Sequence, residues 1–312
     1  MKKIIISSSI VTLLLLLCFA SCKKKEELTP ELMKETSVAG TTTILVDETI
    51  FPVVEDLAMV FESEYKRAKI KLISASETEI LNMINQDKAR IAILARDLDT
   101  TEVVYYNTQK QVYPRRTEFA VDAITFIANA TTKDSVLSPR DITTILQGKP
   151  NGRIKTLVFD NPNSSNLRDL KKMAKVTALP KEGVFSMNSN KEVVKYVTEN
   201  EGAVGVIGVN WLLQPSDDLL PYIGKVKVLG VENVKVKEKN KYIKPNQTNI
   251  ADGSYPVTRK IYLLNFQGSA GLGMGFASYI AGDKGQRIIL KSGLVPKRFP
   301  SREIAVRNEV EK

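Results

Sequence analysis

The sequence predicts an α/β protein in which short strands alternate with helices and form open sheets. From residue 41 onward, short runs rich in β-branched residues alternate with segments whose apolar residues recur at helical spacing. Several of these helical segments begin with the side-chain pattern of a helix N-cap. The chain has 312 residues, 43% of them hydrophobic, which is enough to build two lobes with separate cores.

The strands are predicted from short apolar runs between turn residues. They cover residues 42–46, 69–73, 91–94, 119–128, 154–159, 203–209, 225–229 and 261–266. Most are of ordinary length, but 119–128 is long for a single strand. A strand of that length can run through one sheet and continue into the next, so we expect it to cross from one lobe to the other.

The helices are predicted from apolar spacing and from N-cap signals. Val54, Leu57, Ala58 and Phe61 fall at i, i+3, i+4 and i+7, which gives the first helix an apolar stripe that faces a sheet. Helix starts are marked by capping patterns or by a proline at the first helical position, at Ser76, Asp99, Ser138 and Ser189. We expect further helices at about 76–87, 166–176, 190–200 and 274–291, and an exposed loop over 235–253.

The N-terminus has the pattern of a bacterial lipoprotein signal. Two lysines precede an apolar run over residues 4–19, which is shorter than the roughly 20 residues that a membrane-spanning helix needs. Two small residues then precede Cys22. We expect a signal peptide over 1–21, a lipid on Cys22, a polar tether over 22–40, and a membrane-anchored location in the cell envelope, facing the periplasm or at the outer-membrane surface. A plain secretory peptide and an N-terminal anchor helix are the alternatives.

Composition argues against catalysis. The chain has no histidine and two cysteines, one inside the predicted signal peptide and one at the predicted lipid site. Disulfides, thiol nucleophiles, histidine bases and nearly all zinc sites are therefore excluded from the exported part. We expect a binding protein and not an enzyme, with no metal site and no cofactor. The net charge is +10, but the basic residues are scattered and not interleaved with aromatic ones, so we expect no nucleic-acid partner.

Four turns between a strand and a helix carry hydroxyl, amide or charged side chains. In an open α/β sheet, ligands bind beyond the carboxyl ends of the strands, and the free amides at a helix N-terminus attract anions. Each helix end contributes about 0.3–1 kcal/mol, so several ends together can hold an oxyanion. The same side chains also serve as ordinary N-caps. The turns are Asp47–Thr49, Ser74–Ser76, Arg96–Asp97 and Asn163–Asn166.

A series of short motifs runs along most of the chain. Its members are Thr49–Pro52, Ile93–Arg96, Asp122–Asn129, Leu137–Ile142, Leu146–Lys149, Gly202–Gly208, Tyr255–Arg259, Gly285–Ile289 and Gly293–Pro296. Each motif alone is short and unspecific. In this order, over residues 43–297, the set resembles the PstS-like phosphate-binding proteins of ABC importers, as a divergent lipoprotein member.

The resemblance implies a type II periplasmic-binding-protein fold, in which two α/β lobes are joined by a two-strand hinge. Lobe 1 would comprise 41–120 plus 257–312, and lobe 2 would comprise 121–256. It also implies a monomer that binds phosphate or a similar oxyanion between the lobes and delivers it to an inner-membrane ABC permease. Carried over position by position, the ligand-binding residues are Thr49, Ser76, Arg96, Ser164, Ser165 and Asn166.

Three acidic residues depart from the family pattern. Asp47 and Glu48 stand where the family has small residues or serine, and Asp160 stands where it has an arginine. Two like charges 4 Å apart repel by about 4 kcal/mol at an effective dielectric near 20, and Arg168 is a candidate to replace the missing positive charge. The alternatives are therefore a different small solute, no small ligand, an accessory envelope lipoprotein, a divalent-cation site, and a carboxylate-based hydrolase.

Overall fold

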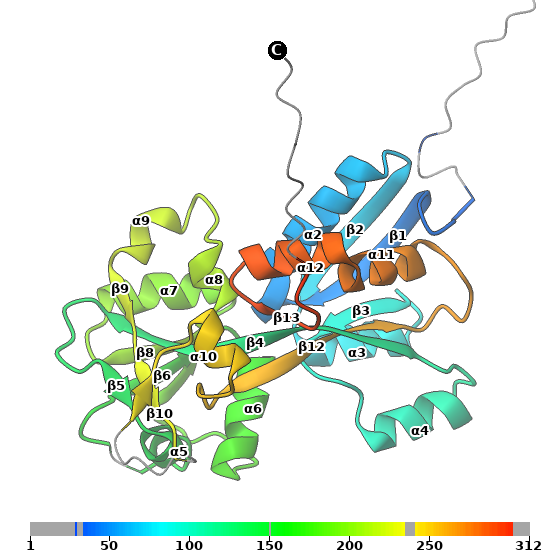
Figure 1. Ribbon diagram of the computed structural model, residues 1–312. Coiled ribbons are helices and arrows are strands. Elements are labelled where there is room, and N and C mark those ends of the chain that lie inside the picture. The colour runs from blue at the N-terminus through cyan, green and yellow to red at the C-terminus, as the bar shows by residue number, and fades with distance from the viewer. Residues whose placement is uncertain (1–28, 30–33, 150, 235–240, 302–312) are drawn as a thin grey trace, which may run out of the picture.

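A computed structural model of the chain shows two α/β lobes that lie side by side and are joined through two long strands (Figure 1). It describes residues 29, 34–149, 151–234 and 241–301. The mixed α/β class that the sequence predicts is confirmed. Within these residues, eight strands form one path of paired strands through both lobes, two more pair with β4 beside this path, and three short strands form a second, smaller sheet.

The first lobe contains the strand order β2-β1-β3-β12-β4. β1 (Gly40–Asp47) pairs in parallel with β2 (Ala68–Ala75) and with β3 (Ile91–Leu94). A 3-10 turn, η2 (Glu48–Ile50), follows β1, and β13 (Val295–Pro296) pairs with β4. The helices of this lobe are α2 (Phe51–Glu64), α3 (Glu77–Asn85), α4 (Thr100–Thr108), α11 (Leu272–Ala281) and α12 (Asp283–Lys291).

Two antiparallel strands connect the lobes. β4 (Arg115–Asn129) pairs over its first part with β12 (Thr258–Asn265). Over Ile124–Ala128 it pairs with β8 (Ala203–Gly208), which belongs to the second lobe. β4 therefore leaves one sheet and enters the next, which confirms the crossing predicted for residues 119–128.

The second lobe contains the order β4-β8-β6-β7. Its remaining strands are β6 (Thr156–Phe159), β7 (Val184–Ser186) and β9 (Val226–Val228), and its small sheet holds β5 (Val136–Leu137), β10 (Gly230–Glu232) and β11 (Tyr242–Ile243). The helices are α5 (Pro139–Leu146), α6 (Ser165–Ala174), α7 (Asn190–Glu199), α8 (Asn210–Leu213), α9 (Leu220–Ile223) and α10 (Gln247–Ala251).

The predicted apolar stripe of the first helix is buried. Val54, Leu57, Ala58 and Phe61 lie on one side of α2 and belong to the main core cluster. Burying a side chain of this size stabilises the fold by about 1.5–3 kcal/mol. The Phe61 ring packs edge-on against Phe276 of α11, at 5.3 Å between centroids, so the stripe fixes α2 against the C-terminal helices.

Most predicted helix starts are confirmed. Ser76, Asp99 and Ser138 each form a complete capping box with the carboxylate three residues later, and such caps contribute about 1 kcal/mol each. Ser189 forms only half of a capping box. Its hydroxyl accepts from the Glu192 amide, but the Glu192 carboxylate accepts from the Asn188 amide instead of the Ser189 amide.

Two predictions about secondary structure are wrong. The single helix expected over 274–291 is broken at Gly282, whose extended backbone ends α11 and begins α12. Gly282 has φ −84° and ψ 171°, so the chain leaves the helical conformation at this residue. The loop expected over 235–253 contains β11 and α10, which are held by hydrogen bonds from asparagines, such as that from the Asn249 side chain to the Lys244 carbonyl.

Some predictions stay untested by the structure. The lobe boundaries, 41–120 with 257–312 and 121–256, remain a prediction. Cys22 and the proposed signal peptide over 1–21 lie outside the described residues. Among the helices that the structure describes, each is too short or too polar to span a membrane.

Candidate functional site

The carboxyl ends of β1, β6 and β8 meet the starts of three second-lobe helices where the lobes face each other. Thr49 lies in η2, directly after β1, and Ser165 is the first residue of α6. Their hydroxyl oxygens are 3.1 Å apart, and both side chains are fully buried. Two turns that are 116 positions apart in the sequence therefore meet, as the strand–turn–helix pattern led us to expect.

A buried guanidinium from the hinge reaches the same point. Arg259 of β12 donates from Nη1 to the Ser165 hydroxyl at 3.0 Å. Its Nε and Nη2 donate to Asp122 Oδ2 of β4, at 3.0 and 2.7 Å. Arg259 is 6% exposed and Asp122 is fully buried, so the site contains an ion pair that is shielded from water.

The start of α6 is organised by Asp160, which follows β6. The Ser164 hydroxyl donates to Asp160 Oδ1 at 2.5 Å, and the Asn166 side-chain amide lies 3.5 Å from the same oxygen. Ser164 also caps α6 by accepting from the Asn166 amide. The three residues predicted at this turn, Ser164 to Asn166, are therefore present at the junction, but an internal carboxylate already accepts from two of them.

Two further helices of the second lobe contact the first-lobe turn. Asn190, the first residue of α7, donates from its backbone amide to Glu48 Oε1 at 3.0 Å and from its side chain to Oε2 of the same residue. Asn210, the first residue of α8, donates to the Thr49 carbonyl at 3.0 Å, and Trp211 Nε1 donates to it at 3.1 Å. Trp211 therefore bridges the two lobes.

Gly208, at the end of β8, allows the lobes to come this close. A Cβ atom at this position would lie 2.5 Å from the Thr49 carbonyl oxygen and 2.7 Å from the Asn210 side-chain amide. Both distances are too short for any side chain without movement of the backbone. The junction therefore needs a glycine here for close approach.

Ser76 and Arg96 have other partners than the Thr49–Ser165 network. The Ser76 hydroxyl donates to Glu79, its capping-box partner. Arg96 donates from Nε to Glu77 at 2.7 Å and from Nη1 and Nη2 to Glu102 at 2.6 and 2.7 Å. The second Glu77 oxygen accepts from Arg168 of α6. Glu77, Arg96, Glu102 and Arg168, here called the paired cluster, thus join the lobes by alternating charges.

Three carboxylates, Asp47, Glu48 and Asp160, form what we call the acid cluster. Asp47 Oδ1 accepts from the Thr49 amide at 3.0 Å and from its hydroxyl at 2.8 Å. Burial, reinforced by the Asp160 charge, raises the pKa of Glu48 to about 8. Burial also raises the pKa of Asp160 to about 6, with Asp47 adding to the rise. Asp47 and Asp160 are each 1% exposed, so these carboxylates are shielded from water.

The divalent-cation alternative has no support in the described part of the chain. Within it, no three Asp, Glu, Cys or His side chains come together in a way that could hold a metal ion. Asp97, in the turn after β3, lies apart from the acid cluster and pairs with Arg116 at 3.1 Å.

The structure brings four of the six predicted ligand residues into one network. Thr49, Ser165 and their neighbours at the start of α6 are linked directly, whereas the donors of Ser76 and Arg96 go to other partners. The roles of all six residues as ligand contacts stay predictions. Asn190 and Asn210 follow the same strand–turn–helix rule and could have been found with it. Arg259 and Asp122 each lie at one end of a motif of the family-like series, but no local pattern indicated their pairing, which joins strands 137 positions apart.

Comparisons with known proteins agree with this architecture. A family model described as the PBP superfamily domain matches residues 34–284. Among curated proteins, none matches this chain. The expected type II periplasmic-binding-protein fold is confirmed by the family match together with the solved structures described next.

Solved structures with this fold include transport proteins and regulators. One, from Clostridium perfringens, is assigned as a phosphate ABC transporter substrate-binding protein with bound phosphate; it has 19% identity and a TM-score of 0.67, covering 83% of this chain and 100% of that one. An ABC-type phosphate transport receptor from Vibrio cholerae has 16% identity and a TM-score of 0.61, covering 82% and 100%. A sulfate-bound mutant of the OxyR2 regulatory domain from Vibrio vulnificus has 13% identity and a TM-score of 0.52, covering 79% and 99%. At these identities the similarity shows the fold alone.

Proposed function

This chain belongs to the PBP superfamily, and on that premise we propose that it is an envelope solute-binding protein that holds a small polar solute between its lobes for ABC-type uptake. The observation that carries the proposal is the meeting of three elements at one buried point. Thr49 comes from the first lobe, Ser165 from the second, and Arg259 from the hinge strand β12. A solute bound there contacts both lobes and the hinge, so its binding is coupled to hinge closure.

Phosphate or a similar oxyanion is the ligand that the family resemblance implies. Arg259 and the first-turn amides of α6 support it, since both favour negative charge. The acid cluster opposes it, because Asp47, Glu48 and Asp160 lie at the same junction. The resemblance and the charge of the site therefore disagree about the ligand, and phosphate stays a prediction to be tested.

Trp211 provides the test of solute binding. It is the only tryptophan of the chain, and its indole bonds across the junction to Thr49. Protein refolded to remove carried-over ligand is titrated with phosphate, sulfate, amino acids and amines, and its fluorescence and binding heat are recorded. Saturable binding of one solute with a change in Trp211 fluorescence is expected. If no solute in the panel binds, the proposal fails. The Trp211→Phe variant is the control for the origin of the fluorescence signal.

The lipid anchor is a separate part of the proposal. The small residues before Cys22 and the apolar run before them support lipid attachment at that cysteine. We expect the full chain, expressed in a bacterium and labelled with a palmitate analogue, to carry the label and to fractionate with membranes. The Cys22→Ser variant should lose both properties. Labelling that persists in this variant would contradict the assignment.

A second candidate is an accessory lipoprotein of the envelope that retains the fold and binds no small solute. One observation favours it: Thr49, Ser164 and Asn190 donate to carboxylates of the chain itself. The junction is thereby closed by internal bonds. This candidate predicts that Trp211 fluorescence is unchanged by every solute of the panel.

A further inference from the structure

We propose that the solute held at the lobe junction carries an ammonium or guanidinium group, bound by buried oxygens of Asp47, Asp160 and neighbouring asparagines. This inference rests on the proposed function and specifies its ligand class. It differs from the phosphate prediction in the sign of the ligand charge. The balance of hydrogen-bond donors and acceptors at the junction points to this ligand class.

The hydroxyl and asparagine side chains at the junction already donate within the chain. Both the amide and the hydroxyl of Thr49 donate to Asp47, and the Ser164 hydroxyl donates to Asp160. The side-chain amides of Asn190 and Asn210 donate to Glu48 and to the Thr49 carbonyl. Sulfate brings only acceptors, and phosphate at neutral pH brings more acceptors than P–OH donors, so either oxyanion would have to compete with internal carboxylates for these donors.

The acceptors are in excess. Among the described residues, six buried side-chain oxygens in this network have no hydrogen-bond partner, and they belong to Asp47, Asp122, Asp160, Asn166, Asn190 and Asn210. All six side chains are 1% exposed or less. Native proteins leave few buried polar atoms unpaired, so this concentration at one point indicates a guest that supplies N–H or O–H donors.

The orientation of two asparagines supports this assignment of free oxygens. The Asn210 side-chain nitrogen faces the Thr49 carbonyl, and that of Asn166 faces Asp160 Oδ1. Each neighbour is an acceptor, so the nitrogen must point at it and the oxygen must point elsewhere. The free oxygens are therefore set by the surrounding bonds.

The charge balance selects a cation among possible donors. The members of the acid cluster face one another, and the charged groups that face them from the hinge strands are Arg259 of β12 and its partner Asp122. Arg259 pairs with Asp122 and its charge also favours ionised Asp160, but this one guanidinium faces Asp122 and all three acids of the cluster, so negative charge remains in excess. Because the described residues offer no metal-binding arrangement, an organic cation with several N–H donors fits better than a metal ion.

Proton release gives a signature of this ligand class. The Glu48 pKa of about 8 and the Asp160 pKa of about 6 mean that the closed junction binds protons near neutral pH. A cation favours the ionised carboxylates, so its binding expels protons and tightens as pH rises from about 6 to about 8. An oxyanion favours the protonated carboxyls and makes the protein take up protons.

The test is calorimetric titration with agmatine, putrescine, phosphate and sulfate. Binding is measured near pH 7 in two buffers of different ionisation enthalpy that contain no primary amine. We expect agmatine or putrescine to bind with proton release. Asp160→Asn should weaken this binding roughly tenfold or more, and Glu48→Gln should reduce the proton release. Asp97→Asn, which changes an acid outside the cluster, is the matched control.

The outcomes separate the inference from the proposed function. Phosphate or sulfate binding with proton uptake, in place of amine binding, would overturn the inference and leave solute binding intact. Amine binding that Asp160→Asn and Glu48→Gln leave unchanged would also overturn it. Absence of binding by every probe here and in the wider solute panel would remove both proposals. If Asp160→Asn does not fold, the loss of proton release in Glu48→Gln still decides the question.

Discussion

The two polar clusters at the lobe junction differ in how their charges are matched. In the paired cluster, each Glu77 oxygen meets a guanidinium, from Arg96 on its own lobe and Arg168 on α6 of the other. In the acid cluster, Asp47 and Asp160 have only hydroxyl and amide donors on one oxygen, and the other oxygen is unpaired. Both clusters bridge the lobes, yet only the first is electrostatically satisfied.

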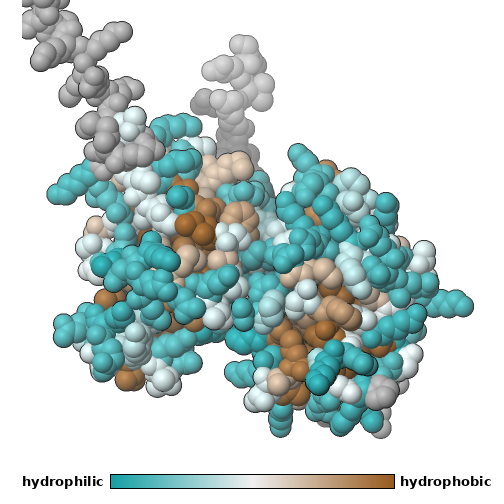
Figure 2. Space-filling view, turned by 180° about the vertical axis from the view of Figure 1, so that it is seen from behind, coloured by the Kyte–Doolittle hydropathy of each residue, from teal (hydrophilic) through white to brown (hydrophobic). Residues whose placement is uncertain are grey.

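This contrast separates a structural contact from a candidate binding site. Alternating charges, as in the paired cluster, hold two surfaces together and need nothing more. Buried acids without cations cost stability unless a ligand or a proton compensates them. The lobe junction therefore contains one region that holds the lobes together and one whose buried oxygens remain unpaired. On the outside, the surface between the lobes is largely hydrophilic in the view from behind (Figure 2).

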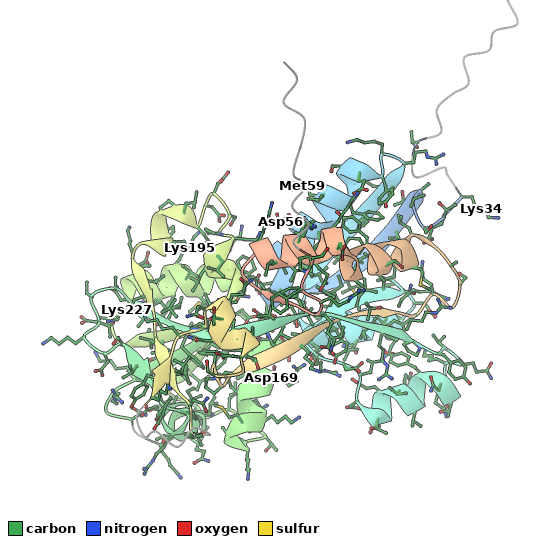
Figure 3. All side chains as sticks on the ribbon, viewed as in Figure 1. Lys34, Asp56, Met59, Asp169, Lys195 and Lys227 are labelled. Atoms are coloured by element: carbon green, nitrogen blue, oxygen red, sulfur yellow. The ribbon has the colours of Figure 1, made fainter. Side chains whose placement is uncertain are left out.

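A further contact between the lobes joins α8 to α2. Gln214, which follows α8, donates from its side-chain amide to Asp56 of α2. Figure 3 labels Asp56 on α2 beside the second lobe. Gln214 is uncharged and Asp56 is half-buried. The contact therefore joins the lobes without adding charge to the acid cluster.

The largest effect is expected from the hinge ion pair. Arg259→Met keeps much of the side-chain volume but leaves Asp122 buried and unpaired, so the free energy of unfolding should fall by about 3–5 kcal/mol. Urea denaturation measures this change. Lys260→Ala, at the next position, removes an exposed pair with Glu118 and should cost at most about 1 kcal/mol. Similar losses in the free energy of unfolding for Arg259→Met and Lys260→Ala would contradict the assignment of Arg259 and Asp122 as a buried ion pair.

Two Glu→Gln substitutions sharpen the comparison of the clusters, because they should have opposite signs. Glu77→Gln weakens charge-assisted bonds to Arg96 and Arg168 and should destabilise the protein by about 1.5–3 kcal/mol. Glu48→Gln removes a carboxyl whose ionised form is unfavourable, so at pH 9 it should raise the melting temperature, on the order of a few degrees. Changes of the same sign would show that the clusters are not distinct.

The pH dependence follows from the raised Glu48 pKa. In the folded protein this carboxyl keeps its proton up to about pH 8, whereas its ordinary value is 4.5. Its contribution to stability is therefore complete below about pH 4.5 and is lost as pH rises through about 8. As pH rises from about 4.5 to about 8, the melting temperature of wild type should therefore fall relative to that of Glu48→Gln. A constant difference from pH 5 to pH 9 would contradict it.

The smallest effect is expected at the hydroxyl that links the three elements. Ser165→Ala removes the oxygen that accepts from Arg259 and contacts Thr49. The loss should be about 0.5–1.5 kcal/mol in the free energy of unfolding. Ser63→Ala, at an exposed serine near the end of α2, should change stability much less, and an equal effect in both would remove Ser165 from the network.

The sequence predicted the fold better than the site. Local signals, such as the Ser76 capping box and the stripe on α2, place individual elements, and the long strand 119–128 indicated the crossing between lobes. The meeting of Thr49 and Ser165 was expected from their turns. The burial of Asp47 and Asp160 was not, because burial at the junction arises from the packing of both lobes. The Arg259–Asp122 pair also depends on strand register across the hinge, which no local pattern contains.

The most direct test of the account is the titration of the acid-cluster carboxyls themselves. Carboxyl carbon NMR of the selectively labelled full chain, with Glu48→Gln and Asp160→Asn for assignment, measures both pKa values without a ligand. Burial and mutual repulsion predict that Glu48 titrates near 8 and Asp160 near 6. If both instead titrate at or below the ordinary values for Glu and Asp, their charges are compensated within the protein, and the case for a cationic guest at this junction is lost.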